Sequence, residues 1–429
     1  MLRSYRSTPE LEADDGADPV VADRRSSTPP SERSFVFVTA PFGPFSRRLA
    51  AQLRAGGARC TRVLVNGGDL LDWGLRHAAI YRGKPSDWPT WIADYFRKEG
   101  ATDLILHGAA YNHAHQAAAE ARRLGMRVHV FEEGYFRPHW VTLERDGVNC
   151  SSSLPKDAET YRKAAPHARM APFVPAGKIT PAGVKRLIAF HTSFILASPL
   201  FPRFRPPYRY SILRQMNGHI GRYFMQAFTK HRTERAVSAI LADSRPLFLA
   251  LLQRPGDAQL TSEAQFNDMR AFIDHVVKSF AAHAPDDARL CFKAHPLDQG
   301  IEPHAKSVRE AAEAAGVADR VTYVDGGHFP TMVRAAVGVI SVNSTGGLSA
   351  LEAGKPTIAL GQAVYGLPGL THQSGLNQFW INPEVPDAAL LVAFRAVVMA
   401  QTQINGDFST PAGMALVVTE AARRMMAAQ

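Results

Sequence analysis

VISVNSTGGLSALEAGKPTIALGQAVYGLPGLT, residues 339–371, has the pattern of a strand, a polar turn, a helix and a second strand. The apolar run at residues 337–342 breaks at the turn NSTGG, residues 343–347. A short helical pattern over residues 348–353 then stops at GKP, residues 354–356. Alternation of strand and helix in this way indicates a parallel sheet covered by helices.

The turn at the start of this predicted helix is a candidate phosphate site. Backbone N–H groups in a first helical turn lack intrahelical partners and lie at the positive end of the helix dipole. Ser344 and Thr345 add hydroxyl donors, and Gly346 and Gly347 let the backbone approach an anion. Glu352 follows two turns later, within reach of the ribose of a nucleotide bound there. An ordinary polar N-cap has the same pattern, and the spacing matches neither G-x-G-x-x-G nor a Walker A loop.

The composition favours a globular protein with anionic partners. The 429 residues allow two domains, and the formal net charge of +10 favours nucleotides, acidic glycans, anionic lipids or nucleic acid. Three widely separated cysteines, Cys60, Cys150 and Cys291, argue against a disulfide framework and a zinc cluster. We therefore expect a cytoplasmic protein, with no signal peptide and no membrane-spanning run of roughly 18 to 20 apolar residues.

Composition and periodicity divide the chain into five segments. They are a disordered tail (1–33), an alternating α/β domain (34–154), a helical segment rich in basic and aromatic residues (155–244), a second α/β domain (245–385) and C-terminal helices (386–429). Two α/β domains joined by a helical segment imply a cleft between facing strand ends. Sugar-nucleotide transferases of the GT-B type have this architecture.

Adjacent carboxylates follow a predicted strand of the first domain. Glu132 and Glu133 come directly after the apolar run at residues 127–131. Partial burial raises the pKa of a carboxyl group, so both are candidates for acid or base chemistry. Alternatively, one is solvated and the other pairs with Arg137.

Histidines follow the neighbouring predicted strand at residues 102–106. His107, His113 and His115 have no Cys or Asp at ligand spacing, so we expect no metal site. His107, at the strand end, is a candidate substrate contact.

The middle segment interleaves apolar and cationic residues over positions 185–210. Such a segment can lie on an anionic membrane surface. A core helix followed by a basic loop in solvent has the same composition. The sequence leaves both interpretations open.

Four strings, in the same order, resemble the capsule polysaccharide biosynthesis family in its KpsS-like branch, which is related to KpsC. They are FEEGYFRPHWVTLERDGVN (131–149), LLQRPGDAQL (251–260), KAHP (293–296) and NSTGGLSALEAGKP (343–356), the last followed by GLT (369–371). Members are similar to retaining β-Kdo transferases, which use CMP-Kdo and build a short Kdo linker on a phosphatidylglycerol-type lipid. The resemblance implies a modified GT-B fold, with an acceptor-side first domain and a nucleotide-sugar-binding second domain.

The resemblance also implies roles for individual residues. Asp257 matches the nucleophile, between Gln253 and Gln259 as substrate contacts, with Gln259 near a position where relatives carry Ser. His295 and Pro296 match a motif that contacts the CMP phosphate, assisted by Lys293 and by the turn at Ser344 and Thr345.

These roles combine into a double displacement. Asp257 attacks the anomeric carbon opposite CMP and forms a glycosyl ester, and Glu132 or Glu133 then deprotonates the acceptor hydroxyl. Arg137 orients the Kdo carboxylate through a bidentate pair. CMP-Kdo is the donor substrate, and we expect no cofactor and no metal.

The implied partners are CMP-Kdo, a phosphatidylglycerol-type lipid, an anionic membrane surface and other capsule assembly proteins. We expect a peripheral protein on the cytoplasmic face of the inner membrane, and no nucleic-acid partner, because no recognition module is present. Two alternatives stay open: a GT-B transferase with another nucleotide sugar, and a non-catalytic export or scaffold protein that binds acidic glycan.

Overall fold

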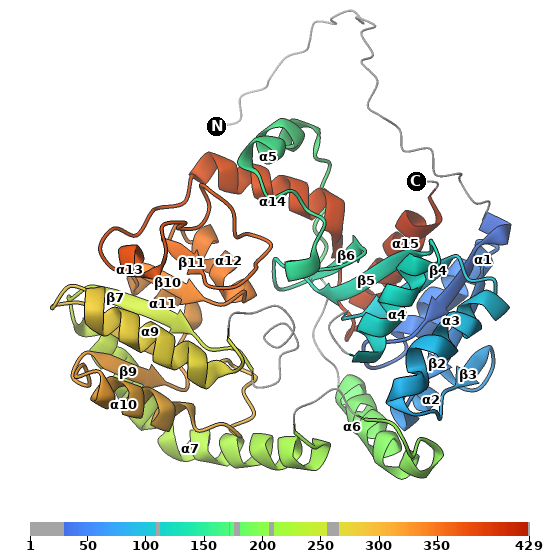
Figure 1. The fold of residues 1–429 in the computed structure, drawn as a ribbon, viewed down its shortest axis with the longest axis horizontal. Coiled ribbons are helices and arrows are strands. Elements are labelled where there is room, and N and C mark those ends of the chain that lie inside the picture. Colours follow the sequence, from blue (N-terminus) through green and yellow to red (C-terminus); the bar gives the residue numbers. More distant parts are fainter. Residues whose placement is uncertain are drawn as a thin grey trace, which may run out of the picture.

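The computed structural model describes residues 30–108, 112–170, 172–175, 181–205, 210–254 and 266–427. Within these ranges the chain builds two α/β units, each around one sheet, with helices between and below them (Figure 1). This confirms the predicted fold class of two Rossmann-like domains in a GT-B type of arrangement.

Most of the predicted tail, 1–33, lies outside the described residues. The part that is described is ordered into the fold: it forms the short turn η1 (Pro30–Glu32), and Arg33 is buried. Arg33 Nε donates to Asp103 Oδ2 at 3.1 Å. The predicted boundary of the tail is therefore a few residues too late.

The N-terminal sheet has the order β12-β6-β5-β4-β1-β2-β3. Its strands are β1 (Ser34–Phe37), β2 (Arg59–Leu64), β3 (Ala78–Ile80), β4 (Asp103–His107), β5 (Arg127–Glu133), β6 (Trp140–Arg145) and β12 (Gln403–Asn405). Strands β1 to β5 are parallel, whereas β6 and β12 are antiparallel to their neighbours. The sheet is therefore mixed, not purely parallel as predicted, because β5 turns directly into β6.

Alternating residues of β1 supply the two faces of this sheet. Phe35 and Phe37 pack with one core under helices α1 (Phe45–Ala55) and α15 (Pro411–Met426). Val36 packs with the opposite core, under α3 (Trp88–Lys98) and α4 (Asn112–Arg123). Successive side chains of a strand point to opposite faces, so one continuous apolar strand lies between two helical layers.

The C-terminal sheet is entirely parallel, with the order β11-β10-β7-β8-β9. Its strands are β7 (Leu247–Leu251), β8 (Arg289–Lys293), β9 (Val321–Val324), β10 (Gly338–Ser341) and β11 (Thr357–Ala359). The helices are α9 (Met269–His283), α10 (His304–Ala314), α11 (Phe329–Ala335), α12 (Thr345–Glu352) and α13 (Leu376–Phe379). The predicted strand, turn, helix and strand of residues 339–371 are thus β10, α12 and β11.

The segments between and after the domains connect both units. The remaining helices are α2 (Gly67–Trp73), α5 (Ala158–Ala164), α6 (Pro181–Leu196), α7 (Ile212–Ala242) and α14 (Ala388–Thr402), with short 3-10 turns η2 (Pro85–Asp87), η3 (Asn149–Ser151), η4 (Ala165–His167) and η5 (Ser198–Leu200). Helix α6 packs on α2, and α7 lies beneath β9 (Figure 1). After α14, the chain returns to the N-terminal sheet as β12 and α15, so residues 386–429 contain a strand besides the predicted helices. None of the helices in the described ranges combines the length and apolarity that crossing a bilayer requires.

Candidate functional site

The candidate site begins at the centre of the C-terminal sheet. Strands β7 and β10 are neighbours whose chain connections run to opposite sides, and in open α/β sheets a ligand crevice lies at such a point. Gln253 follows β7, Asn343 follows β10, and Gln253 Nε2 donates to Asn343 Oδ1 at 2.7 Å. Gln253 Oε1 is buried and has no hydrogen-bond partner among the described residues, so it can accept from a bound hydroxyl.

The turn after β10 caps α12 through its own side chain. Ser344 Oγ accepts from the backbone N–H of Gly346 at 3.1 Å, and Thr345 is half-buried. The glycines have a packing role that the sequence did not predict. A Cβ atom on Gly347 would lie 2.3 Å from the Tyr365 hydroxyl, so glycine is required there with or without an anion.

The end of β8 carries two basic side chains. Lys293 is buried, and burial lowers the pKa of its ammonium group. Burial also lowers the pKa of His295 to about 4, helped by the positive charges of Arg254, Arg137 and Lys293. His295 Nδ1 accepts from the backbone N–H of Leu297 at 3.0 Å. A neutral His295 therefore carries its proton on Nε2, as a donor for an anionic oxygen.

Arg137 belongs to the N-terminal domain, and its positive charge helps to lower the pKa of His295 in the C-terminal domain. Arg137 lies in the turn between β5 and β6 of the N-terminal sheet, and its guanidinium is exposed. Its one direct contact among the described residues is long, from Nε to Gly134 O at 3.4 Å. Asp298, whose charge opposes these cations at His295, lies with Oδ2 3.3 Å from Nε2 of His304. The positive charges of Arg254, Arg137 and Lys293 therefore outnumber the negative charge of Asp298 around His295.

His107 and Glu133 are the last residues of the neighbouring strands β4 and β5 in the N-terminal sheet. His107 ends β4, and burial lowers its pKa to about 4 against the opposing charge of Glu133. His107 N–H donates to Thr39 Oγ1 at 2.9 Å, while its buried Nε2 has no partner among the described residues. Its ring lies edge-on to Phe408, with the centroids 5.3 Å apart.

The two adjacent glutamates have different surroundings. Both belong to β5, opposite Thr142 and Val141 of β6, so the prediction that they lie in a loop after the strand is wrong. Glu133 is exposed and close enough to His107 to influence its pKa. Glu132 is half-buried, and its charge acts instead on the buried hydroxyl of Tyr135. Alternation along the strand separates them.

The structure describes one of three further predicted site residues. Asp257 and Gln259 lie outside the described residues. Glu352 ends α12, at the opposite end from Ser344, and forms an ion pair with Arg395 of α14. Glu352 and Arg137 line one pocket of about 440 Å³, and the contact of Glu352 with a ribose stays a prediction.

Arg222 of α7 is a positioning residue that the sequence analysis did not identify. It donates to the backbone oxygens of His295, Pro296 and Asp298, and its guanidinium pairs with Asp325 after β9. One side chain thus fixes the exposed turn at Pro296 and the neighbouring strand end. These partners lie 73 to 103 residues along the chain, so no local pattern indicated them.

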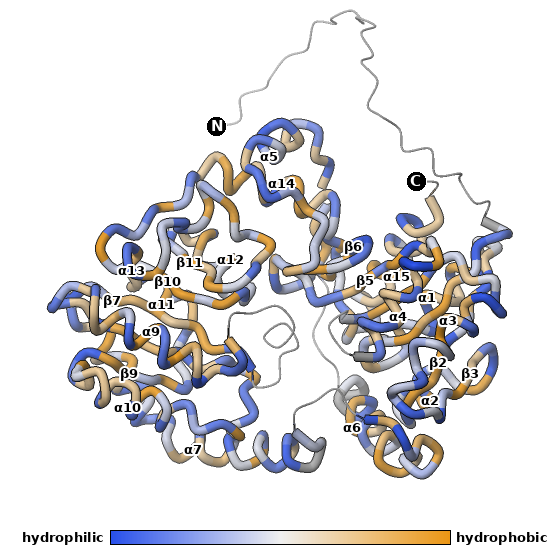
Figure 2. The backbone as a smooth tube through the Cα atoms, viewed as in Figure 1, coloured by the Kyte–Doolittle hydropathy of each residue, from blue (hydrophilic) through white to orange (hydrophobic). Residues whose placement is uncertain are grey.

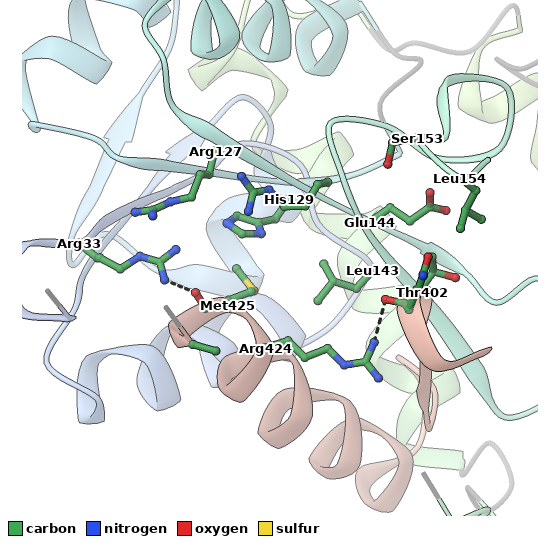
Figure 3. Close-up of a pocket in the computed structure, with 13 residues that line it drawn as sticks. Arg33, Arg127, His129, Leu143, Glu144, Ser153, Leu154, Thr402, Arg424 and Met425 are labelled. Carbon is green, nitrogen blue, oxygen red and sulfur yellow. Dashed lines mark hydrogen bonds between the residues drawn. The ribbon is translucent and has the colours of Figure 1, made fainter. Parts of the chain in front are cut away.

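A pocket of about 190 Å³ opens at the amino ends of the N-terminal strands, away from the cleft. Arg33, Arg127 and His129 gather on one side of it (Figure 3). All three contact Asp103. Burial alone would raise the pKa of Asp103, but hydrogen bonds from His129 and Arg33 hold it below its ordinary value. The two arginines and the imidazole of His129 stabilise a buried carboxylate and belong to the fold.

Metal ligands do not gather at either rim of the cleft: among the described residues, no group of three His, Cys, Asp or Glu side chains could hold an ion. The three cysteines form no disulfide, and Cys60 and Cys291 are buried.

Comparisons with known proteins cover most of the chain. The family model "Capsule polysaccharide biosynthesis protein" matches residues 102–409. The chain is 30% identical over 383 residues to the capsule polysaccharide export protein KpsS of Escherichia coli, covering 87% of this chain and 96% of that protein. It is also 30% identical over 396 residues to the capsule polysaccharide modification protein LipB of Neisseria meningitidis serogroup B, covering 88% of this chain and 92% of LipB.

Two solved structures align with most of the chain at low sequence identity. The β-Kdo 2,7-transferase of KpsC from Thermosulfurimonas dismutans aligns with a TM-score of 0.44 and 12% identity, over 92% of this chain and 99% of that one. MnaA of S. aureus with UDP aligns with a TM-score of 0.30 and 12% identity, over 92% and 96%. Neither likeness carries an argument about activity. The family model and the two relatives at 30% identity confirm the resemblance of the four strings: this chain belongs to the capsule polysaccharide biosynthesis family.

Proposed function

We propose that this chain is a retaining glycosyltransferase that moves Kdo from CMP-Kdo to a phosphatidylglycerol-type lipid and so starts the poly-Kdo linker of a capsular polysaccharide. Its place of action is the cytoplasmic face of the inner membrane, together with other capsule assembly proteins. The observation that carries the proposal is the pair of basic side chains, Lys293 and His295, at the carboxyl end of β8 in a chain that belongs to the capsule polysaccharide biosynthesis family. Membership of the family and the resemblance to Kdo transferases supply the substrate.

The charges of the cleft suit a donor with two anions. CMP-Kdo carries a phosphate on the leaving group and a carboxylate on the sugar. His295 would donate from Nε2 to a phosphate oxygen, and Lys293 would balance the charge that develops as CMP departs. Arg137, from the opposite domain, would hold the sugar carboxylate, since a guanidinium matches it with two parallel hydrogen bonds.

The N-terminal rim supplies the base for the second half of the reaction. In the first half, the Asp257 carboxylate attacks the anomeric carbon, and the bond from that carbon to the phosphate oxygen of CMP breaks. In the second half, the acceptor oxygen displaces Asp257 while Glu133 takes the hydroxyl proton. Glu133 is favoured over Glu132 because it is the more exposed and lies near His107 at the rim. The role of Asp257 rests on the resemblance.

The test is transfer by purified protein. Wild-type protein receives CMP-Kdo generated in situ and a fluorescent phosphatidylglycerol analogue, and mass spectrometry follows the addition of one Kdo. We expect addition by the wild type and none by Asp257→Ala, with circular dichroism confirming that the variant is folded. If the protein releases CMP only from another CMP-sugar, or transfers sugar only from another nucleotide sugar, that compound is the donor in place of CMP-Kdo.

A non-catalytic role is the second candidate, and the name of the E. coli relative, an export protein, favours it. A scaffold that binds acidic glycan predicts that charge reversal of the basic residues at 203–209 abolishes capsule formation, while Asp257→Ala leaves it intact. The transferase predicts that Asp257→Ala abolishes it.

A further inference from the structure

Helix α7 packs on the C-terminal domain along one side. Arg222 and Gln226 contact Asp325 there, and Thr233 lies against Gly326. Towards the C-terminal end of the helix, Val237 and Ile240 join an apolar core of that domain. The inward side is therefore polar around Arg222 and apolar at Val237 and Ile240.

The outward side of the same helix carries an apolar stripe. Its members are Met216, Ile220, Tyr223, Phe224 and Phe228, which recur at helical spacing on one side. They are strongly exposed, with 73% of Tyr223 and 84% of Phe228 accessible to solvent. Single exposed apolar residues are ordinary, but a contiguous aromatic stripe marks an interaction surface.

Helix α6 also exposes apolar side chains, namely Leu187, Ile188, Ile195 and Leu196. In Figure 1, α6 and α7 lie along the same lower edge of the molecule, one beneath each domain, and in Figure 2 hydrophobic residues recur along both. Exposed apolar residues thus occur on both helices at this edge.

The charge around the stripe is almost entirely positive. Residues 181–242 contain ten lysines and arginines and one acid, Glu234. Two of the cations are engaged within the fold, Arg186 with Asp72 and Arg222 with Asp325. Exposed aromatic and aliphatic side chains flanked by cations suit the boundary of an anionic bilayer, where rings enter the head-group region and cations meet phosphates.

We propose that the apolar stripe of α7 is the docking face of this protein for an anionic lipid bilayer, with α7 lying in the plane of the head groups. This inference deepens the proposed function, because it explains how a chain whose described helices do not span a membrane reaches a lipid acceptor. A protein partner of the same chemistry would need a matching acidic and apolar face.

Docking through α7 would also fix the height of the cleft above the lipid. Arg222 holds the backbone of His295, Pro296 and Asp298, and it is adjacent to Tyr223 of the stripe. The same helical turn thus faces the lipid on one side and the nucleotide-binding loop on the other. Movement of α7 on the membrane would be transmitted directly to that loop.

The experiment is flotation of the full chain with vesicles. One set contains phosphatidylcholine alone, and the other contains phosphatidylcholine with phosphatidylglycerol. We expect the wild type to float with the anionic vesicles and to be released by salt. The double variant Phe224→Ser/Phe228→Ser should bind roughly tenfold more weakly, because less apolar surface enters the bilayer.

A matched control removes apolar surface elsewhere. Val385 and Val392 are 71% and 70% exposed but lie away from α7, and Val385→Ser/Val392→Ser should float like the wild type. Equal flotation of wild type and stripe variant would overturn the proposal. So would a wild type that ignores anionic vesicles and self-associates on size exclusion through the stripe, since the stripe would then be a protein interface.

Different measurements test the docking proposal and the proposed transferase activity. Flotation requires no chemistry, so stripe-dependent binding by a protein that transfers no Kdo supports docking and removes the proposed function. Conversely, the stripe variant should keep transfer to a short-chain, water-soluble phosphatidylglycerol and lose it with vesicles. Loss of transfer to both acceptors, in a variant that still floats, would contradict docking through this stripe.

Discussion

The five parallel strands of the N-terminal sheet, β3-β2-β1-β4-β5, follow the same order as the five strands of the C-terminal sheet, β9-β8-β7-β10-β11. The side chains at the carboxyl ends of these strands differ in chemistry between the two sheets. In each, the two strands at the switch point are bridged by one hydrogen bond: His107 to Thr39 in the N-terminal sheet and Gln253 to Asn343 in the C-terminal sheet. Beyond these bridges, the C-terminal rim is cationic and the N-terminal rim carries Glu133. Two sheets of the same topology can therefore carry loops with different roles, one binding an anion and the other removing a proton.

Two half-buried histidines provide the most direct contrast between the rims. His107 ends β4 and His295 lies two residues beyond β8, and burial lowers the pKa of each to about 4. We expect His295→Ala to lower kcat by about 10²- to 10³-fold, because a donor to the leaving phosphate is lost. His107→Ala should cost less. Steady-state kinetics on both variants measures the difference, and equal losses would contradict the assignment of His295 to the leaving group.

The adjacent carboxylates of β5 test the N-terminal rim. Glu133→Gln should lower kcat about 10²-fold, because the amide takes no proton, while Glu132→Gln should stay close to the wild type. Rates across a pH series distinguish the two, since loss of the base should remove the acidic limb of the profile. A larger effect at Glu132 would assign the base to the other side of the strand.

The stability of the fold should depend on the pH through His107. Burial lowers its pKa from 6.5 to about 4, so the folded chain favours the neutral ring while the unfolded chain binds a proton more readily. This contribution to the free energy of unfolding is fully present above about pH 6.5. It is lost as the pH falls towards 4, and the loss is on the order of 2 kcal/mol. Thermal unfolding at pH 7 and pH 4.5 measures this, and His107→Gln should reduce the dependence. An unchanged dependence in the variant would assign the loss to other groups.

Arg222 tests whether α7 positions the C-terminal rim. Arg222→Gln removes the ion pair with Asp325 and the bonds to the His295 backbone, so we expect KM for CMP-Kdo to rise roughly tenfold. Arg222→Lys keeps the charge and should restore part of the loss. If kcat and the melting temperature both fall and KM does not change, Arg222 has a role in folding only.

Local patterns predicted the central parts of both domains. The strand predicted at residues 102–106 is β4 (Asp103–His107), and β10, α12 and β11 follow the order expected from residues 339–371. Each of these elements has its apolar periodicity and its breaking residues in adjacent sequence. Such elements can be inferred from one chain.

Features that depend on distant partners were missed. Strand β12 pairs with β6, with Gln403 opposite Thr142, and no local pattern can indicate a pairing across that separation. Gly347 was interpreted as space for an anion, but its neighbour is Tyr365. The ion pair of Glu352 with Arg395 of α14 was not predicted. Side-chain partners, unlike periodicity, are set by the tertiary fold.

The return of the chain as β12 and α15 has a consequence for synthesis. Met414 and Val417 of α15 share one core with Phe35 and Phe37, the first strand of the fold. The domain that leaves the ribosome first is therefore completed last, after the whole second domain has been made. A chain released before residue 411 would lack α15, and the core of its N-terminal domain would be incomplete.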